Sequence, residues 1–375
     1  MSFTLYYEPL DTLFFRDSRP FSAGDDTWAE TVLPLPLTVF GSIGSYILKK
    51  NETDLAAFFS GGEDKTLGGY DETLSKTKMK IKGPFLSRHD QVYVPCPVSL
   101  VMIDGKICKK LKPDLNTSPK WDIEDRDLRP IGLPEGKVEP VVQFVSSEEV
   151  IEYLSDIEVC PYGASSEYLF DYERRFGHKL NRGSLTVEEG FLYSADHLRL
   201  RDSLESKRYV KTELMVFVDG IDASVISDSV VHIGGERRMA RIRTADSVDI
   251  FPAHPDVIDR ASETGRFLVC FLTPALFRDG FKRRWPEEFE EINAALVGAA
   301  VGKPVYMSGW RRTGVSKGRP RPLKRAVPAG SVYFFQAGEV DREKFKALYN
   351  KYNFNDSLSE EYTHAGFGIA LIGTW

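Results

Sequence analysis

The sequence predicts an α+β protein with two tandem ferredoxin-like domains, each with the element order βαββαβ, and a large insertion in the first domain. One observation behind this is the order of strand and helix patterns in residues 265–375, which by itself gives a complete βαββαβ unit. The other is a weak internal repeat, in which a histidine, a glycine two residues later and then a strand occur at His232 and again at His364. Each domain would then have a glycine loop between its second helix and its fourth strand.

The predicted boundary between the domains lies in residues 245–265, which are rich in Asp, Pro and Ser. The first domain then spans 1–250 and the second 260–375. Residues 51–170 show the least regular pattern and are predicted to be the insertion, with a short strand pair within 83–104 and an acidic stretch after it. We expect that acidic stretch to be solvated surface, with protein docking as the alternative.

The elements of the first domain follow from local patterns. Residues 3–10 are rich in aromatic side chains and predict the first strand. Residues 34–50 predict a helix, because apolar residues recur at helical spacing, Thr38 is a plausible N-cap and two lysines end the segment. Runs of β-branched and aromatic residues predict three further strands, at 170–180, 190–200 and 209–220.

The second domain is predicted in the same way. Residues 286–300 predict a helix, because a proline stands in its first turn and acidic residues follow near the positive end of the helix dipole. A second helix is predicted over 341–352, with Phe345, Leu348 and Tyr349 on one face. Strands are predicted at 265–277, 303–310, 328–336 and 366–375.

Positive charge is concentrated in one segment of an acidic chain. The formal net charge is −6, which argues against indiscriminate binding to polyanions but leaves room for a local anion site. Residues 303–336 carry eight basic side chains and no acidic one, so the rest of the chain carries −14. Because Tyr306 and Trp310 offer flat faces among these charges, the segment suits single-stranded nucleic acid, with a flexible solvated hairpin as the alternative. The basic residues are Lys303, Arg311, Arg312, Lys317, Arg319, Arg321, Lys324 and Arg325.

A second basic segment follows the first histidine. If residues 237–243 form a strand, its two-residue period places Arg237, Met239, Arg241 and Arg243 on one face and Arg238, Ala240 and Ile242 on the other. The backbone N–H groups of Gly234 and Gly235 could approach an oxyanion just before it. A phosphate fits this arrangement, because the guanidinium fork binds it in bidentate fashion. The alternative is an edge strand whose arginines are solvated or paired with the acidic insertion.

Several classes of protein are excluded or disfavoured. The four cysteines, Cys96, Cys108, Cys160 and Cys270, form neither a CxxC pair nor a cysteine–histidine metal pattern, so we expect reduced thiols and no metal. There is no P-loop and no dinucleotide fingerprint, so we expect no cofactor. The N-terminus lacks a basic start, and no run approaches about 18 apolar residues, so we expect no signal peptide, no membrane contact and a cytoplasmic location.

Seven segments together resemble one known family. They are FFRDSRPFSAGDD, PLPLTVFGSIGSYI, EEGFLYSADHLRL, IGGERRMARI, GRFLVCFLTPALF, GWRRTG with KRAVPAGSVYFF, and the terminal HAGFGIALIGTW. The chain is similar over nearly its whole length to the third subunit of the Cmr complex, a RAMP protein of the type III-B CRISPR effector. A type III-D relative is the nearest alternative.

The resemblance implies two RRM-like ferredoxin folds with glycine-rich loops and a non-catalytic role in antiviral defence. Such a subunit caps one end of the complex and holds the 5′ handle of the crRNA, beside the large polymerase-palm subunit and the first backbone RAMP subunit, and it meets target RNA only indirectly. The matching RNA-binding positions are Arg16, Arg19, Gly234, Gly235, Arg237, Arg238, Gly366, Phe367 and Gly368. The charge pattern adds Arg241, Arg243, Arg311, Arg312, Lys317, Arg319 and Arg321. In the first loop Ser18 stands where the family usually has glycine, which puts the path of that loop in doubt.

Two other functions are kept open. A metal-independent RAMP endoribonuclease that processes CRISPR RNA would need a general base, for which His364 and His232 are the candidates. A metabolic enzyme that binds a phosphorylated small molecule would use the glycine loops but leave the basic segment 303–325 without a role. Spacing alone gives no serine–histidine–acid or paired-carboxylate arrangement, so an RNA-binding subunit without catalysis is the leading hypothesis.

Overall fold

The structure is a computed structural model that describes residues 2–15, 33–117, 128–156, 160–184, 186–205, 208–311, 318–338 and 340–375. The chain divides into two compact units that are discontinuous in sequence. Unit 1 comprises Met1–His89, Ser166–Ser247 and Tyr306–Arg325, and unit 2 comprises Asp90–Ser165, Val248–Val305 and Ala326–Trp375. The predicted consecutive domains, 1–250 and 260–375, stay a prediction, although one change of unit falls within the predicted boundary at 245–265.

The sheet of unit 1 is antiparallel and begins with the first predicted strand. Its strands are β1 (Phe3–Pro9), β4 (Lys80–Arg88), β13 (Arg208–Asp219), β14 (Ser229–His232) and β15 (Met239–Asp246), in the spatial order β14-β15-β1-β13-β4. If β1, β4, β13 and β15 are numbered 1 to 4 along the chain, their order across the sheet is 4-1-3-2. The prediction that residues 51–170 are an insertion is wrong for β4, because this strand is part of the main sheet. It pairs with β13 and not only with a strand inside 83–104.

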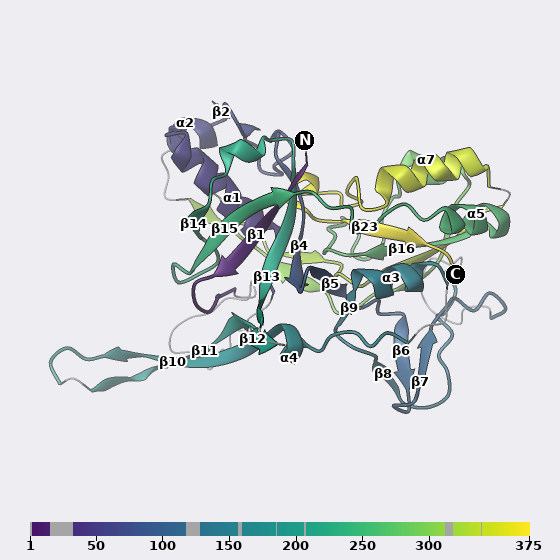
Figure 1. Cartoon of the computed structure of the whole chain (residues 1–375), viewed down its shortest axis with the longest axis horizontal. Helices are drawn as coiled ribbons and strands as arrows, with labels where there is room; N and C mark the ends of the chain where they lie inside the picture. Colours follow the sequence, from purple (N-terminus) through teal and green to yellow (C-terminus); the bar gives the residue numbers. More distant parts are fainter. Residues whose placement is uncertain are drawn as a thin grey trace. The chain divides into compact units, whose positions relative to one another are not determined.

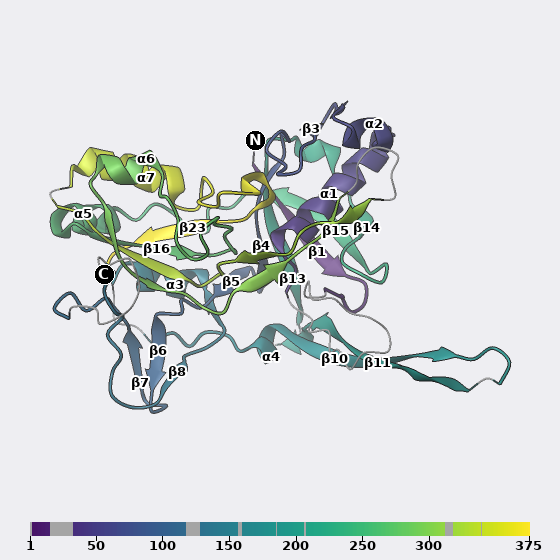
Figure 2. The same cartoon turned by 180° about the vertical axis from the view of Figure 1, so that it is seen from behind.

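Helix α1 (Pro36–Lys50) packs against one face of this sheet (Figure 2). Phe3, Leu5 and Tyr7 of β1 are buried on that face, and Val39 and Ile43 of the helix are buried as well. The predicted helix is confirmed, but Thr38 is not its N-cap: Leu35 is, without a side-chain hydrogen bond, and Pro36 occupies the first helical position. Proline suits that position because its missing N–H would have no partner there and its φ is already helical.

A long hairpin leaves unit 1, formed by β10 (Phe170–Leu180) and β11 (Val187–Leu200) (Figure 1). These strands and β13 confirm three predictions from runs of β-branched and aromatic residues. Unit 1 also contains short elements: α2 (Leu55–Phe59), β2 (Glu63–Asp64), β3 (Gly68–Gly69), α4 (Ser166–Leu169), β12 (Asp202–Glu205), η1 (Ala223–Val225), β19 (Trp310–Arg311) and β20 (Arg319–Pro320). The strands β18 (Val305–Met307) and β21 (Lys324–Ala326) pair with each other at the two ends of the segment that contains β19 and β20.

The sheet of unit 2 has the same arrangement as that of unit 1. Its strands are β16 (Arg266–Phe271), β17 (Ala295–Ala300), β22 (Val332–Gln336) and β23 (Ala370–Gly373), all antiparallel, in the spatial order β17-β22-β16-β23. If these four strands are numbered 1 to 4 along the chain, their order across the sheet is 2-3-1-4. Read from the other edge this is 4-1-3-2, the same order as in unit 1. The order β16, α6 (Glu287–Glu291), β17, β22, α7 (Arg342–Tyr352), β23 also matches the predicted βαββαβ pattern.

The predicted helix over 286–300 is only half right. Helix α6 ends at Glu291, and Asn293 then has a φ of 51°, a left-handed conformation that a helix does not continue through. The small and apolar residues after it form β17, which pairs with β22. The predicted helix is therefore too long, because its second half is the strand β17.

Both faces of the unit 2 sheet are covered (Figure 1). Helices α5 (Pro255–Thr264) and α7 pack on one face, where Phe267, Phe335 and Phe345 are completely buried. Helix α3 (Ser147–Leu154) covers the other face, since a Cβ on Gly373 would lie 2.7 Å from the Leu154 carbonyl oxygen. Because α3 comes from 51–170, that segment supplies part of this core.

The acidic stretch before and within α3 is not simply solvated. Glu149 accepts the Ser146 backbone N–H in a capping box and also the Gly163 N–H. Asp156 pairs with Lys112 at 2.8 Å and with Lys110 at 3.3 Å. The first part of that stretch, in residues 118–127, and Glu158 lie outside the described residues. Unit 2 also contains β5 (Gln91–Pro95), β6 (Leu100–Ile103), β7 (Ile107–Lys110), β8 (Val138–Pro140), β9 (Phe144–Ser146) and η2 (Thr363–Ala365).

Two exclusions can be compared with the described parts of the chain. No helix there is both long and apolar enough to cross a membrane. The four cysteines are free thiols, and burial raises the pKa of both Cys96 and Cys270 to about 12, so these two stay protonated at neutral pH.

Candidate nucleic-acid interface

The glycine segment of unit 1 forms a tight turn between β14 and β15. The Arg238 N–H donates to the Gly235 carbonyl over 3.1 Å, and the Ile233 N–H donates to the Arg238 carbonyl over 2.9 Å. The two central residues of the turn, Glu236 and Arg237, have φ values of 51° and 55°, as in a type I′ hairpin turn. Arg237 therefore lies in the turn and not in the predicted strand 237–243, which begins at Met239, and its side chain is exposed.

The two glycines are explained by a close approach of the N-terminal segment. Gly234 has a φ of 77°, and a Cβ there would lie 2.5 Å from the Phe14 carbonyl oxygen. The Gly235 N–H donates to the same oxygen over 2.8 Å. The prediction that both amides face an oxyanion is therefore corrected for Gly235, whose N–H is used inside the protein.

The predicted alternation of exposed and buried residues along β15 is confirmed. Met239, Arg241 and Arg243 are exposed, and Ala240 and Ile242 are buried. This arrangement presents cations on the sheet face opposite α1, because the residues that alternate with them contribute to the core under that helix. We refer to the exposed side of β15 and β1 as the outer face of unit 1.

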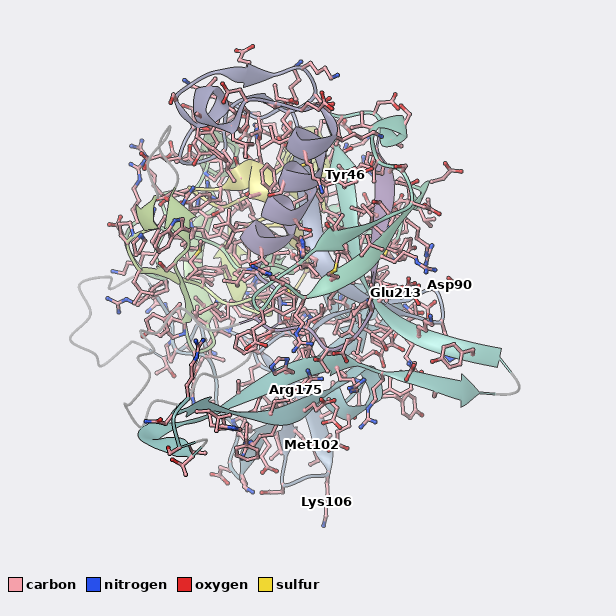
Figure 3. All side chains as sticks on the ribbon, turned by 90° about the vertical axis from the view of Figure 1, so that its left-hand side faces the viewer. Tyr46, Asp90, Met102, Lys106, Arg175 and Glu213 are labelled. Carbon is pink, nitrogen blue, oxygen red and sulfur yellow. The ribbon has the colours of Figure 1, made fainter. Side chains whose placement is uncertain are left out.

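The two arginines on this outer face have different surroundings. The Arg243 guanidinium lies 3.9 Å above the centre of the Tyr6 ring and donates to Glu213 over 2.7 Å. Glu213, labelled in Figure 3, comes from β13. Arg241 stands opposite Glu8 in the register, but its side chain has no ion pair with any residue in the described ranges.

Sequence reasoning missed the groups that complete this face. Tyr6 supports Arg243, and Lys211 of β13 pairs with Glu8 and lies 5.4 Å from the centre of the Tyr209 ring. Tyr209 is 61% exposed, so an aromatic face is available beside the charges. The signal was present in the alternation of the predicted strands 3–10 and 209–220, which places these residues on the side away from the core.

Arg238 points away from that face into a group of ion pairs at the base of the hairpin. Its Nη1 lies 2.8 Å from Asp11 Oδ2, and its Nη2 lies 3.3 Å from Glu236 Oε2. Arg175 of β10 and Arg199 of β11 approach the same Asp11 carboxylate at 3.4 and 3.6 Å (Figure 3 labels Arg175). We name this group the hairpin-base cluster, which consists of Asp11, Glu173, Glu236, Arg175, Arg199, Arg238 and His197.

The cluster contains three arginines and three carboxylates. Its charges are therefore compensated within the protein, and it is not an open anion site. A hydrogen bond from the Thr12 N–H, and then Arg175 and Arg238, hold the pKa of Asp11 below its usual range. His197 is 2% exposed, stacks on Phe14 with ring centres 4.9 Å apart, and lies 3.5 Å from Glu236. Burial and then the Arg238 charge lower the pKa of His197, so the ring is neutral at pH 7. Arg238 is therefore not carried into the candidate RNA surface.

The basic segment 303–325 is only partly described. Arg16, Arg19, Arg312 and Lys317 lie outside the described residues, and of Arg311 and Arg319 only the strand positions are described. Arg321 donates to the Glu72 carbonyl over 2.8 Å and to the Tyr70 hydroxyl over 3.3 Å, so this arginine fastens the segment to another part of unit 1. Trp310, predicted as a flat face, is 58% exposed.

The glycine loop of unit 2 is buried. Phe367 is inaccessible, the Gly368 N–H donates to the Pro274 carbonyl over 2.8 Å, and a Cβ on Gly368 would lie 2.2 Å from the Ser359 nitrogen. Gly366 has a φ of 87° and is buried as well. These positions were predicted to contact RNA, but the structure explains Gly366, Phe367 and Gly368 by packing, and we do not include them in the candidate surface.

The two histidines of the endoribonuclease alternative lie in different units. His232 ends β14, where its carbonyl accepts the Ser42 hydroxyl and its ring has no hydrogen-bond partner among the described residues. His364 lies in η2 of unit 2 and is half-buried. Within the described ranges, no group of three or more His, Cys, Asp and Glu side chains is arranged to hold a metal ion.

Comparison with known proteins gives one family and several similar folds. Residues 5–375 match the family described as CRISPR-associated protein (Cas_Cmr3). No curated protein matches the chain. A subunit in a cryo-EM structure of the Type III-B Cmr-beta complex bound to cognate target RNA and AMPPnP is similar with a TM-score of 0.50 and 17% identity, over 93% of this chain and 89% of that one.

Two further structures share less of the geometry. A second cryo-EM structure of Type III-B Cmr-beta bound to cognate target RNA gives a TM-score of 0.49 at 17% identity, over 88% of this chain and 86% of that chain. A chain of the Csm3-Csm4 subcomplex of the type III-A interference complex gives 0.36 at 10% identity, over 90% and 98%. At these identities a likeness bears on the fold alone.

Proposed function

Because the chain belongs to the Cas_Cmr3 family of CRISPR-associated proteins, we propose that it is a non-catalytic RNA-binding subunit of a type III-B Cmr effector complex and holds the 5′ handle of the crRNA. The observation that supports this most is the outer face of unit 1. Arg241 is exposed there, and Arg237 is exposed in the turn just before β15, both without a carboxylate partner among the described residues, beside Arg243 on the Tyr6 ring.

The chemistry of this face suits a single RNA strand. Guanidinium groups bind phosphate oxygens in bidentate fashion and stack on bases, and Tyr209 offers an exposed aromatic ring. Glu8 and Glu213 partly neutralise the face, so its attraction for RNA is local and not a long-range field. Phosphates would set the register of the strand, and stacked bases would carry any sequence preference.

The tandem ferredoxin-like fold belongs to the same proposal. Its support is the identical arrangement of four strands in both sheets, together with α1 after β1 and α7 before β23. In the complex the neighbours would be the large polymerase-palm subunit and the backbone RAMP subunit, with target RNA met only indirectly, in the cytoplasm. An RNA-bound type III-B structure that contains a chain of similar fold supports this assembly.

The experiment measures binding of handle RNA to the purified full chain at several salt concentrations. In the double variant R237E/R241E we expect the affinity to fall at least about tenfold, because two charge-assisted contacts are lost and two repulsive ones are introduced. The chain should still fold, since both side chains are exposed. The matched control is R278E/R284E, which reverses two exposed arginines of unit 2 and should leave the affinity within about twofold.

Two results would overturn the proposal. Unchanged handle affinity in R237E/R241E would remove the RNA-binding role of the outer face. Specific cleavage of CRISPR repeat RNA in EDTA, abolished by His364→Ala or His232→Ala, would replace the non-catalytic role with the metal-independent endoribonuclease.

A further inference from the structure

A row of lysines runs along one side of the chain as it enters β4. Lys76, Lys78, Lys80 and Lys82 alternate with Thr77, Met79 and Ile81, which are buried. The first three lysines are exposed and Lys82 is half-buried. Within the strand, Lys80 and Lys82 are about 6.6 Å apart, since each residue advances about 3.3 Å, and Lys76 and Lys78 lie in the turn and bend that lead into it. This spacing is comparable to that between successive phosphates of an extended nucleic-acid strand.

The charges of Lys76, Lys78 and Lys80 are only weakly compensated. Lys82 forms an ion pair with Asp219 at 4.0 Å, whereas Lys78 Nζ reaches the Lys65 carbonyl, at 3.5 Å. For Lys76 and Lys80 the described parts of the chain supply no side-chain ion pair. The nearby Asp71 is occupied by its own turn, because it accepts the hydroxyls of Thr73 and Ser75 and the Lys76 backbone N–H.

The segment that carries the basic residues of 303–325 is fastened next to this row. Arg321 donates to Glu72 and Tyr70, and the same turn leads through Asp71 directly to Lys76. Two basic stretches that are far apart in the sequence are thus brought together within unit 1. Arg325, which follows in the same segment, is exposed and adds to the positive charge.

The row also shares a sheet face with the candidate handle site. The register pairs Lys82 with Phe217 and Phe217 with Thr4, which is on the same side of β1 as Tyr6. β4 and β15 are separated by three strand spacings, about 14 Å, and Thr4 and Phe217 between them are buried, so the two sites are distinct.

We propose that Lys76, Lys78 and Lys80 form a second RNA-binding site, which holds the sugar–phosphate backbone of a single strand without reading its sequence. Ammonium groups on flexible stems act as point charges on phosphates, and no exposed aromatic residue interrupts the row to stack a base. This inference rests on the proposed function only in that the chain handles RNA, and it adds a sequence-independent contact outside the handle site. An acidic peptide is the other polyanion that such a row could attract, and the test separates the two.

The test uses the full chain, a twenty-nucleotide uridine oligomer as sequence-free probe, and handle RNA. In the variant K76Q/K78Q/K80Q the slope of log affinity against log salt for the uridine oligomer should fall by about 2, since each phosphate contact on a single strand contributes about 0.7. The variant K76R/K78R/K80R should keep the slope. The control K106Q/K109Q/K344Q removes the same charge from exposed lysines of unit 2, of which Lys106 projects from the β6–β7 turn (Figure 3), and should also keep it.

Each outcome bears on one claim. An unchanged slope in K76Q/K78Q/K80Q, or an equal drop in the unit 2 control, would overturn the lysine site and leave the handle proposal intact. Loss of binding to a polyglutamate peptide with unchanged binding to the uridine oligomer would assign the row to an acidic protein instead. If the wild-type chain binds neither RNA, the proposed function fails with it.

Discussion

The two units contain sheets with the same strand arrangement but different exposure. In unit 1 helix α1 covers one face. The other face has exposed arginines on β15 and the exposed Tyr209, although Thr4, Met215 and Phe217 on it are buried. In unit 2 the helices α5, α7 and α3 cover both faces. The glycine loops differ in the same way: Gly234–Arg238 is at the surface, and Gly366–Gly368 is in the core. A shared topology and a shared glycine motif therefore do not imply a shared function, and we assign RNA to unit 1.

The largest expected effect concerns the two glycine loops. Gly368→Ala should lower the free energy of unfolding by about 3 kcal/mol or more, because its φ is 68° and the added Cβ would meet the Ser359 backbone. Gly235→Ala should cost less, about 1 to 2 kcal/mol, since only the Phe14 ring, 2.9 Å from the added Cβ, would have to shift against His197. Chemical denaturation of both variants measures the difference. Equal costs would show that the loops are packed alike.

A smaller effect is expected at the turn of unit 1, where one substitution should raise stability and lower RNA affinity. Arg237→Gly should stabilise the chain by about 1 kcal/mol, because glycine accepts the left-handed conformation that Arg237 adopts with a φ of 55°. The same change should weaken binding of handle RNA, since an exposed guanidinium is removed. Thermal unfolding and RNA titration together check this. A variant that is more stable and binds equally well would remove Arg237 from the RNA surface.

The pH dependence of unit 2 should show a buried lysine. Burial lowers the pKa of Lys110 to about 8, although Asp156 beside it acts in the opposite direction. Its folded pKa lies below its unfolded value, so the unfolded chain binds more protons above pH 8 and stability rises with pH there, by about 1 kcal/mol up to pH 9. Denaturation curves from pH 7 to 9 measure this. Lys110→Met should flatten the curve, and an unchanged slope in that variant would contradict the assignment.

The smallest effect is expected in the hairpin-base cluster. Asp11→Asn should cost less than about 1 kcal/mol, because the carboxylate is half exposed and solvent screens its pairs. It should nevertheless speed hydrogen exchange at the base of β10 and β11, since Arg175 and Arg199 lose a shared partner. Mass spectrometry of deuterium uptake resolves this. Slower exchange in the variant would mean that Asp11 strains the hairpin.

Local patterns predicted most elements, and the failures came from information that local patterns lack. Residues 34–50 and 341–352 were predicted correctly because their periodicity is set by burial on one side, and residues 3–10 because aromatic side chains favour strands. Residues 80–88 were assigned to an insertion, since nothing near them in the sequence indicates that they pair with β13. The helix predicted over 286–300 failed because an acidic first turn does not determine where a helix ends.

The candidate site was predicted only in part. The alternation of Arg241 and Arg243 with buried Ala240 and Ile242 was visible in the sequence. That Arg238 turns into a cluster with Asp11 was not visible, because the partner is far away in the sequence. The alternating lysines before β4 were a local signal, and they were overlooked because the segment was taken for an insertion.

Cross-linking of handle RNA to the full chain, followed by mass spectrometry of the cross-linked peptides, tests the central claim most directly. The account predicts cross-links to Tyr6 and to the peptide from Gly234 to Arg243, on the outer face of unit 1. Cross-links concentrated at Gly366–Gly368, with none on β1 or β15, would contradict it.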